Sequence, residues 1–386
     1  MTRAESLTLL SAANSFDEVR FADHHLARHL ARYGPVLVVD PPQSPLRFRR
    51  EQFAMPGLRR VGPNLTRYTP WAPPAPERPG VVSVTTRLMG HGIRRAVDAL
   101  GLPLGVHIAT SVLVPIHQYV RAAHNVFWWQ DDFVAGAELM GVSARRNENG
   151  QRALLRESDY VVAANPLLYE RSIAAGASTR LIPFGCDLSA FPANRETDRP
   201  ADLALPDGYA VLMGQLGPRV DRALLYAVVD RGIPLLLIGP MHDAATHRAW
   251  QPLLNRRLVQ WVGPKPVSAL AGYLARASVG CVPYVSSAFN RASFPLKTLE
   301  YLAAGLPVVA TNLPAVEWLH APDIVQVDRP RDFADAVARC HSQSRSDRAV
   351  EARRAFVVRH TWPARAAEWA GLLEQLRKPW EQTCTL

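Results

Sequence analysis

The sequence predicts an α/β protein with two doubly wound domains, and three observations lead to this prediction. The chain has 386 residues, which is more than one hydrophobic core usually holds. Residues 7–40 show the order strand, helix, strand, with which a doubly wound sheet begins. Residues 286–314 show a loop, a short helix and a buried apolar strand, so the second half contains a similar unit.

The composition limits the classes of protein to consider. Hydrophobic residues make up 48% and charged residues 20%, as in a globular protein. The chain has no uncharged apolar run of about eighteen residues and no signal-peptide pattern, so we expect a cytosolic protein without a membrane span. The cysteines are far apart and form no C-x-x-C pair, so we expect reduced thiols, without a metal site or a disulfide framework.

The net charge of +10 suits a nucleic acid, an anionic membrane surface or a phosphorylated substrate as partner. The arginines are scattered and no basic run alternates with aromatic residues, so a nucleic acid is not expected. Peripheral contact with an anionic membrane at its inner face stays open. So does the alternative that the arginine content has no functional meaning.

The first domain is expected at residues 1–190. Its first elements are a strand at 7–13, a loop at 14–20, a helix at 21–33 and a strand at 35–40. Because ligands collect above the carboxyl ends of strands in such a domain, Asn14, Ser15 and His24 are candidates for a ligand site in the first domain. For His24 and His25 the pattern favours a surface role on the helix. No glycine-rich dinucleotide fingerprint follows the first strand, which argues against a nicotinamide enzyme.

Residues 41–80 are rich in proline and arginine and lack periodicity, so we expect a loop, a candidate flap over an acceptor or a membrane. Further strands are expected at 105–110 and 125–130, and the second runs into Asp131 and Asp132. Neighbouring side chains alternate, so at most one of the two carboxylates can face a ligand. It can bind acceptor hydroxyls or share a proton, or instead cap a helix. No D-x-D pattern occurs, so no metal is expected.

The first domain ends with a charged helix, a second helix and a strand, expected at 145–158, 167–175 and 179–183. Residues 188–207 are polar and contain prolines, so we expect a hinge there, with the linker at 191–207. The second domain follows at 208–360. Its further strands are expected at 235–238, 258–262, 278–282 and 306–311, and a later helix at 332–340. A last amphipathic helix is expected at 362–376, in the C-terminal segment 361–386.

The second domain opens with a strand at 209–213, which brings Gly214 and Gly217 to a ligand site. Glycine lets a backbone approach a phosphate closely. Arg219 follows, and its guanidinium can grip a diphosphate through two parallel hydrogen bonds, unless it is an ordinary surface arginine. The start of this domain therefore predicts a phosphate contact.

A helix is predicted at 295–304, because Ser293 is a good N-cap, Pro295 suits the first turn and Gly305 can end the helix. The start of a helix favours an anion, so a phosphate is the expected ligand. Lys297 adds a cation, and Glu300 offers two acceptor oxygens to vicinal hydroxyls such as a ribose diol. The alternative is an ordinary helix with a solvated lysine and glutamate. The residues expected to bind the nucleotide diphosphate are Gly214, Gly217, Arg219, Ser293, Phe294, Pro295, Leu296, Lys297 and Glu300.

The order Pro-Leu-Lys-x-x-Glu-Tyr-Leu-Ala-Ala-Gly-x-Pro-Val-Val at 295–309 resembles the donor-binding segment of GT-B glycosyltransferases, in particular a bacterial subgroup of the family 4-like group. Pro-Phe-Gly-Cys-Asp at 183–187 resembles a turn of the same group. The resemblance implies two Rossmann-like domains that face a cleft, with the acceptor in the first and the donor in the second. It also implies that the last helix, in residues 361–386, crosses back to the first domain.

By this resemblance we expect transfer of a sugar from a nucleotide-diphosphate sugar to an acceptor hydroxyl, with retention, without metal or cofactor and with no covalent residue named. Glu300 would hold the donor ribose, while Lys297 and Arg219 would offset the charge of the leaving diphosphate. Asp131 or Asp132 stands where related enzymes often carry a histidine near the reaction centre. The acceptor would be a glycan, a lipid-linked or a small molecule in bacterial polysaccharide, glycolipid or secondary-metabolite biosynthesis.

One position departs from the family pattern. Ala292 stands where the family commonly has the first of two glutamates, so a contact from that position to the donor sugar or phosphate is in doubt. The departure keeps open a homologue that binds a nucleotide sugar or a glycan without turnover. A sugar-nucleotide epimerase of the same fold is a third possibility, and release of free nucleotide diphosphate without sugar transfer would indicate it.

Overall fold

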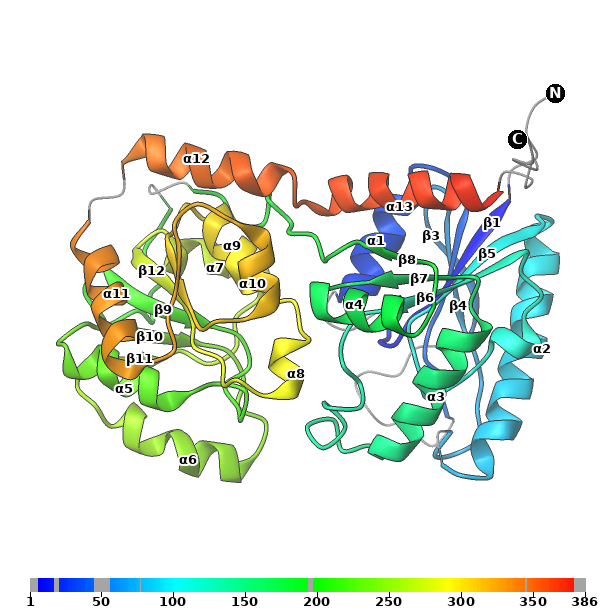
Figure 1. Ribbon diagram of the computed structural model, residues 1–386, viewed down its shortest axis with the longest axis horizontal. Coiled ribbons are helices and arrows are strands. Elements are labelled where there is room, and N and C mark those ends of the chain that lie inside the picture. The colour runs from blue at the N-terminus through cyan, green and yellow to red at the C-terminus, as the bar shows by residue number, and fades with distance from the viewer. Residues whose placement is uncertain are drawn as a thin grey trace. The chain divides into compact units, whose positions relative to one another are not determined.

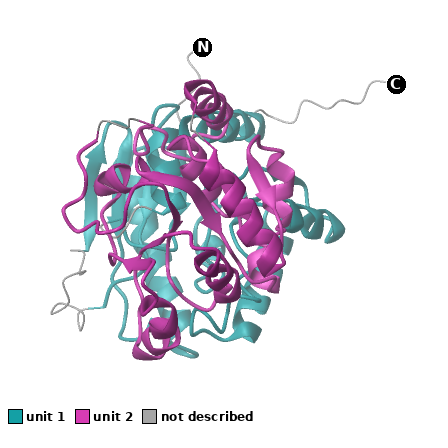
Figure 2. Cartoon of the chain, turned by 90° about the vertical axis from the view of Figure 1, so that its left-hand side faces the viewer, with its two compact units in different colours: residues 1–183, 362–386 teal, residues 184–361 magenta. Residues whose placement is uncertain are grey.

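The computed structural model describes residues 6–16, 21–44, 56–76, 78–193, 197–343 and 346–377. The chain divides into two compact units, of which the first contains Met1–Pro183 and Trp362–Leu386 and the second contains Phe184–Thr361 (Figure 2). Each unit has its own sheet flanked by helices (Figure 1). The predicted α/β architecture with two doubly wound domains is confirmed.

The described part of the first unit contains a sheet with the order β3-β4-β2-β1-β5-β6-β7-β8. Its strands are β1 Leu7–Ser11, β2 Val36–Val39, β3 Gly57–Gly62, β4 Leu65–Thr69, β5 Leu104–Ala109, β6 His124–Trp129, β7 Tyr160–Ala163 and β8 Thr179–Leu181. Only β3 and β4 pair in antiparallel fashion among these strands. The strand order reverses between β1 and β5, and ligands usually bind at the carboxyl ends of strands beside such a reversal.

The helices of the first unit include one from the end of the chain. The helical segments are α1 Ala22–Leu30, α2 Val81–Leu100, the short 3-10 turn His117–Tyr119, α3 Ala144–Glu157, α4 Pro166–Ala174 and α13 Trp362–Arg377. The last of these, α13, packs against α1 (Figure 1). Trp369 of α13 meets Trp128 of β6 edge to face, with 5.4 Å between the ring centroids. The C-terminal helix thus returns to the unit that contains the start of the chain, as predicted.

Residues 41–80 contain β3 and β4, so the prediction of a continuous loop was wrong. Strand β4 alternates between buried and half-buried residues, but its buried side combines Leu65 with Arg67. Arg67 pairs with the buried Asp40, with 2.6 Å between Nε and Oδ2. A charged side chain therefore occupies a position where the alternation rule expects an apolar one. Residues 45–55 of the expected flap lie outside the described residues.

The described part of the second unit has a parallel sheet with the order β11-β10-β9-β12-β13-β14. Its strands are β9 Tyr209–Met213, β10 Leu235–Ile238, β11 Val259–Trp261, β12 Ala277–Val282, β13 Val308–Ala310 and β14 Ile324–Gln326. The chain runs outward from β9 to β11 and then returns to β12 beside β9. The order reverses between β9 and β12, where Rossmann folds with this strand order bind nucleotides.

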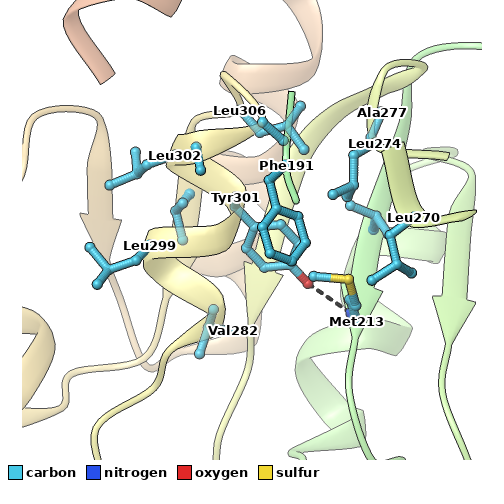
Figure 3. Close-up of a cluster of buried hydrophobic side chains, with 14 of the residues drawn as sticks. Phe191, Met213, Leu270, Leu274, Ala277, Val282, Leu299, Tyr301, Leu302 and Leu306 are labelled. Carbon is cyan, nitrogen blue, oxygen red and sulfur yellow. Dashed lines mark hydrogen bonds between the residues drawn. The ribbon is translucent and has the colours of Figure 1, made fainter. Parts of the chain in front are cut away.

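Two hydrophobic cores lie on the two faces of this second sheet. The helices are α5 Arg222–Asp230, α6 Ala244–Leu254, α7 Val267–Leu274, α8 Ala288–Arg291, α9 Lys297–Ala303, α10 Pro314–Leu319, α11 Pro330–Ser342 and α12 Asp347–Val358. Val211 and Met213 of β9 join a core with residues of α7 and α9 (Figure 3). Their neighbours Ala210 and Leu212 join a second core with residues of α5 and α11. The strand is buried on both faces, which explains its unbroken apolar sequence.

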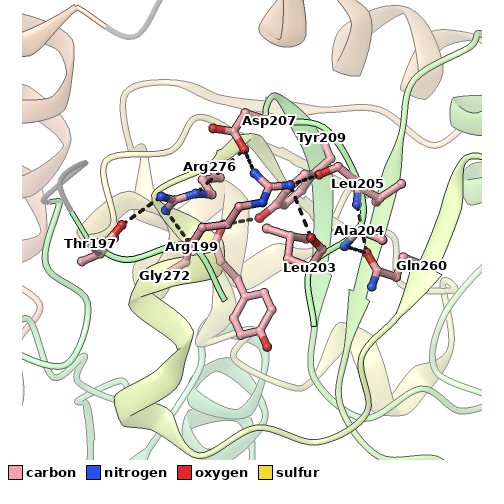
Figure 4. A network of polar contacts seen from close by, with 11 residues as sticks. Thr197, Arg199, Leu203, Ala204, Leu205, Asp207, Tyr209, Gln260, Gly272 and Arg276 are labelled. Carbon is pink, nitrogen blue, oxygen red and sulfur yellow. Dashed lines mark hydrogen bonds and ion pairs between the residues drawn. The ribbon is translucent and has the colours of Figure 1, made fainter. Parts of the chain in front are cut away.

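Residues 191–207, expected as a linker between the domains, lie within the second unit. Three apolar residues of this segment are buried in the core: Phe191, Leu203 and Leu205. Arg199 pairs with Asp207, and Arg276 donates to the carbonyl of Thr197 at 2.9 Å (Figure 4). The polar residues that predicted a hinge therefore hold the segment against its own unit.

Candidate functional site

The reversal point of the second sheet brings together residues from three parts of the chain. Gly214 follows β9, Tyr284 follows β12 and Lys297 begins α9. An antiparallel bridge joins Val220 to Tyr284. Cε of Lys297 lies 3.8 Å from the place that a Cβ atom on Gly214 would occupy. The lysine side chain therefore reaches the end of β9.

Tyr301 fixes α9 to the sheet. Its hydroxyl oxygen accepts the N–H of Met213, the last residue of β9, at 2.7 Å (Figure 3). Its ring lies against β12 at Gly280, where an added Cβ would come within 2.3 Å of the ring. A glycine is therefore needed at this point of β12, and the pair of contacts determines where the first turn of α9 lies relative to β9.

Lys297 and Glu300 form an ion pair, with 2.5 Å between Nζ and Oε2. The lysine side chain is 29% exposed and the glutamate side chain 10%, so the lysine is the more accessible of the two. Burial alone would lower the pKa of Lys297, but the Glu300 carboxylate raises it above its ordinary value. The lysine is therefore charged at neutral pH, and an incoming anion must share it with this carboxylate.

Arg219 is oriented by the buried Asn290 of α8. Nε of Arg219 donates to Oδ1 of Asn290 at 2.7 Å, and Nδ2 of Asn290 donates to the carbonyl of Arg219 at 3.1 Å. The guanidinium lies over the rings of Phe289 and Tyr284, 4.7 Å and 5.1 Å from their centroids. Tyr284 also influences the pKa of Lys297, so the two cations share a neighbour. The half-buried, oriented guanidinium suits anion binding better than a role as a mobile surface arginine does.

The start of α9 differs from the prediction. The helix begins at Lys297 instead of residue 295, and its N-cap residue Leu296 forms no side-chain cap. Ser293 is not the cap either, because its hydroxyl donates to the carbonyl of Phe289 at 2.9 Å. The one-turn helix α8 lies directly before this turn, and the carbonyl of its residue Phe289 accepts the hydrogen bond of the serine. No pattern in the sequence predicted α8.

The turn before α9 offers fewer free N–H groups than predicted. The N–H of Leu296 donates to the carbonyl of Phe294 at 2.9 Å, and the N–H of Thr298 donates to the carbonyl of Pro295 at 3.0 Å. Residues 293–295 are buried. The positive charge in this region therefore comes from the lysine and arginine side chains more than from the helix start, and α9 itself has only seven residues.

Two residues of this region were missed by the sequence analysis. Asn290 carries no recognisable signal, because an asparagine in a polar loop is common. Gly239 follows β10 with φ +145°, and an added Cβ would lie 1.8 Å from the carbonyl oxygen of Gly214. The loops after β9 and β10 thus meet backbone to backbone, and only glycine fits at residue 239.

The predicted residue Gly217 is buried, and its carbonyl accepts the N–H of Val220 at 3.1 Å.

The described part of the first unit contains a hollow of about 500 Å³ at the carboxyl ends of β1 and β2. The candidate residues Asn14 and Ser15 line it, as predicted for the loop after β1, and Gln43 lines it from the loop after β2. The other walls come from residues 75–78 and 141–146. The hollow therefore occupies the ligand position that a doubly wound sheet provides.

The loop after β1 is held by buried carboxylates beneath it. Oδ2 of Asp23 accepts the N–H of Ala13 at 2.9 Å, and Oδ1 of Asp23 accepts Nε2 of Gln130 at 2.5 Å. Burial raises the pKa of Asp23 despite these hydrogen bonds. Oδ1 of Asp40 accepts the N–H of Phe16 at 3.1 Å. The backbone is thus fixed on both sides of the two residues that line the hollow.

His24 lies under this loop and not on the surface, so the favoured surface role was wrong. His24 is fully buried, and its Nε2 is 3.1 Å from the carbonyl oxygen of Asn14. His25 is half-buried and stacks on Trp362, with 5.2 Å between the ring centroids. His24 is buried by the loop after β1, whose Phe16 ring lies edge-on to it, whereas His25 is partly covered by α13, which comes from the other end of the chain.

The side chain of Asp132 stabilises the turn after β6. Its Oδ1 accepts the N–H of Ala135 at 2.9 Å, and its Oδ2 pairs with Nη1 of Arg171 at 2.6 Å. This geometry fits the capping alternative. Asp131 is half-exposed, and its carbonyl accepts the N–H of Phe133. Neither aspartate is among the residues that line the hollow.

Three further observations concern metals, membranes and thiols. Among the described residues, no group of three or more His, Cys, Asp or Glu side chains is arranged to hold a metal ion. The helices within the described ranges are too short or too polar to span a bilayer. Cys186, Cys281 and Cys340 are free and buried, and burial raises the pKa of each thiol.

Residues 203–343 match the family model described as glycosyl transferases group 1. The match lies within the second unit. It includes Arg219, Asn290, Lys297 and Glu300, so the constellation at the sheet reversal lies inside the matched residues.

Two curated relatives extend the similarity beyond the matched residues. The putative teichuronic acid biosynthesis glycosyltransferase TuaH of Bacillus subtilis (strain 168) is 27% identical over 242 residues, which are 60% of this chain and 59% of TuaH. The chain thus spans less than two thirds of TuaH. D-inositol 3-phosphate glycosyltransferase of Paenarthrobacter aurescens (strain TC1) is 26% identical over 324 residues, 70% of this chain and 78% of that enzyme.

Solved structures match the whole architecture. Sucrose-phosphate synthase from Thermosynechococcus elongatus has a TM-score of 0.75 at 21% identity and covers 96% of this chain and 99% of its own. The α,α-trehalose 6-phosphate synthase from Burkholderia multivorans has a TM-score of 0.67 at 14% identity, with 97% and 99% covered. Anabaena Alr3699/HepE in complex with UDP-glucose has a TM-score of 0.67 at 14% identity, with 96% and 99% covered. The chain has the GT-B fold.

Proposed function

We propose that this protein transfers a sugar from a nucleotide-diphosphate sugar to an acceptor hydroxyl. The observation that carries the proposal is the gathering of Lys297, Arg219 and Glu300 at the reversal between β9 and β12, inside the residues that match the group 1 family model. Doubly wound folds bind nucleotides at this point of the sheet, and the three side chains match the charges and hydroxyls of a nucleotide diphosphate. The naming of both curated relatives as glycosyltransferases supports it.

The donor is bound by the second unit in this proposal. Lys297 and Arg219 take the diphosphate, and Glu300 accepts hydrogen bonds from the ribose hydroxyls. The lysine and glutamate are paired in the free protein, so donor binding inserts the ligand between partners that are already charged and aligned. Anabaena Alr3699/HepE was solved with UDP-glucose, which makes uridine diphosphate sugars the first donors to test.

In this proposal the second unit also stabilises the leaving group during the reaction. As the bond between the anomeric carbon and the diphosphate oxygen breaks, negative charge grows on the leaving diphosphate. The acceptor oxygen forms the new bond to that carbon and passes its proton to the departing diphosphate. Two oriented cations in a half-buried position lower the energy of this charge more than they lower that of the bound donor. We expect retention of configuration and assign no covalent residue and no metal or cofactor.

The acceptor is bound by the first unit in this proposal, in the hollow lined by Asn14 and Ser15. His24 acts beneath the hollow as a support for the loop, and Asp131 remains the one candidate of its pair with a half-exposed side. TuaH is named for teichuronic acid biosynthesis, so envelope polysaccharide is the pathway class we favour over glycolipids or secondary metabolites. A cytosolic location, with or without peripheral membrane contact, is part of the same proposal.

The deciding experiment mixes purified protein with UDP-glucose, UDP-galactose and UDP-glucuronate and measures both UDP binding and UDP release. We expect binding of UDP in the micromolar to millimolar range of ordinary substrates and slow donor hydrolysis in the absence of an acceptor. No UDP binding, together with no hydrolysis or transfer, would reject the proposal. Free UDP with a changed sugar and no transfer to any acceptor would instead indicate an epimerase.

A binding protein without turnover is the second candidate, and Ala292 favours it. This residue is fully buried in the turn between α8 and α9, and its methyl group stands where the family commonly has a carboxylate. If that carboxylate is required for chemistry, the chain binds a donor and does not turn it over. Tight UDP-sugar binding with no hydrolysis or transfer would support this candidate, and an Ala292→Glu variant that gained turnover would support it further.

A further inference from the structure

The hollow of the first unit has a charge pattern that indicates the chemistry of its ligand. Arg78 and Arg146 line it from opposite segments of the chain, and the described lining residues include no aspartate, glutamate or histidine. A hollow with two guanidinium groups and no carboxylate attracts anions, and arginine binds phosphate or carboxylate oxygens in pairs. Among the described lining residues, the positive charge is therefore not balanced by a carboxylate.

Neither arginine is used to hold the fold together within the described ranges. No described residue forms an ion pair or a hydrogen bond with the guanidinium group of Arg78 or Arg146, and the Ser143 cap uses the backbone N–H of Arg146. Arg67, by contrast, is 4% exposed and is committed to Asp40. Arg146 belongs to the first turn of α3, whose N-cap residue is Ser143, so the positive end of a fourteen-residue helix adds to the same wall.

A second and independent feature also indicates a ligand. Gln43 lines the hollow and is only 6% exposed, yet no described residue forms a hydrogen bond with its side-chain amide. Its backbone is fixed, because its N–H donates to the carbonyl of Pro70 and its carbonyl accepts the N–H of Ala72, both at 2.9 Å. This amide forms no hydrogen bond within the described chain and is therefore available to a ligand in the hollow. The fixed backbone keeps this amide at the wall of the hollow.

We propose that the hollow binds an acceptor that carries an anionic group, a phosphate or a carboxylate, with Arg78 and Arg146 on the anion and Gln43 and Asn14 on neighbouring hydroxyls. This inference rests on the proposed function, because it names the acceptor class of the proposed transfer. The neutral polar groups of the wall suit a sugar ring, while the two guanidinium groups suit a charge at its edge. The anion can belong to a free sugar phosphate or to a membrane headgroup, and the experiment separates the two sources.

The test measures binding of glucose 6-phosphate and of glucose by calorimetry, with UDP present to occupy the second unit. We expect glucose 6-phosphate to bind at least about tenfold more tightly than glucose, and Arg78→Ala and Arg146→Ala each to weaken it about tenfold. Arg145→Ala is the matched control, because Arg145 is exposed next to Arg146 on α3 but does not line the hollow. Arg146→Lys should restore part of the lost affinity.

A second arm uses sedimentation with vesicles of phosphatidylcholine, with and without phosphatidylglycerol. Binding to the anionic vesicles that is lost in Arg78→Ala and Arg146→Ala but kept in Arg145→Ala would assign the anion to a membrane headgroup. The inference is overturned if neither probe binds, if glucose binds as well as glucose 6-phosphate, or if the two variants bind like the wild type. UDP affinity is measured for every variant, so a failed donor site and a failed acceptor inference give different results.

Discussion

The two candidate sites of this molecule both lie at the carboxyl ends of parallel strands, yet they are built differently. The second unit draws Lys297, Glu300 and Tyr301 from one short helix and fixes that helix to β9 and β12. The first unit assembles its hollow from the ends of β1 and β2 and from two segments far along the chain, at 75–78 and 141–146. The comparison teaches that the central pair of one site, Lys297 and Glu300, is carried by a single helix, whereas the other site depends entirely on how distant loops meet.

The difference in construction suggests that the two sites tolerate amino-acid substitutions to different degrees. A ligand that every reaction cycle shares can be bound by a fixed motif, and changes there should affect binding and turnover directly. Loops that only meet in the folded chain can change one at a time without disturbing the sheet, which suits a site whose ligand differs between relatives. The predictions below test whether the two sites differ in this way.

Substitution of Lys297 should have the largest effect. Lys297→Ala removes one of the two cations at the proposed diphosphate position, so we expect turnover to fall about hundredfold with a smaller loss of donor affinity. Steady-state kinetics with the donor identified by the UDP-sugar panel would measure both values. Lys265→Ala is the control, because Lys265 pairs with Asp202 away from the sheet reversal. Equal turnover of Lys297→Ala and wild type would remove the lysine from the reaction.

Substitution of Glu300 should have the next largest effect, on binding. Glu300→Ala removes the proposed ribose contact, and a charged hydrogen bond of about 1.5–3 kcal/mol corresponds to at least a tenfold rise in the donor dissociation constant. Calorimetry with UDP measures this rise. Glu317→Ala, at an exposed glutamate of α10, should leave the dissociation constant unchanged. Loss of the carboxylate also frees Lys297, so an unchanged or tighter UDP affinity would contradict the ribose role.

The same division explains how far the sequence could predict the molecule. Strand β9 was predicted at its observed bounds because a strand buried on both faces is apolar throughout. Lys297 and Glu300 were found because a single helix carries them three residues apart. The prediction of a linker at 191–207 was wrong because its few apolar residues are buried, while Asp202 and Asp207 form ion pairs with Lys265 and Arg276 of other segments.

The first site was less predictable for the same reason. Asn14 and Ser15 followed from the rule that ligands bind beyond strand ends. Arg78 and Arg146 could not be chosen from so many arginines, because nothing local distinguishes a lining arginine from an exposed one. His24 was misjudged because the loop after β1 folds over it and brings the carbonyl of Asn14 and the ring of Phe16 against its own ring. Contacts between distant segments are what a single sequence shows least.

Substitution of Gly280 should produce an intermediate effect that separates packing from chemistry. In Gly280→Ala the added methyl group meets the Tyr301 ring, which destabilises the second unit by about 1–3 kcal/mol and displaces α9. We expect a lower melting temperature and a weaker UDP affinity. Gly150→Ala is the counterpart in the first unit, where the methyl group would lie 1.9 Å from the carbonyl oxygen of Val112. It should lower the melting temperature and leave UDP affinity unchanged. Equal losses of UDP affinity in both variants would contradict the assignment of UDP binding to the second unit.

Acid should act on the first unit through His107, and this is the smallest expected effect. Burial lowers the pKa of His107 from 6.5 to about 4, and its Nε2 is 3.0 Å from the hydroxyl of Ser11 on β1. The unfolded chain therefore takes up a proton below pH 6.5 that the folded chain does not, so stability is lost as the pH falls from 6.5 toward 4. At about pH 5.5 the loss from this group is roughly 1 kcal/mol, or about 2–4 °C in melting temperature. His107→Gln should lack this part of the acid dependence while its UDP affinity stays that of the wild type, and an acid dependence identical to wild type would mean that His107 is protonated in the folded protein.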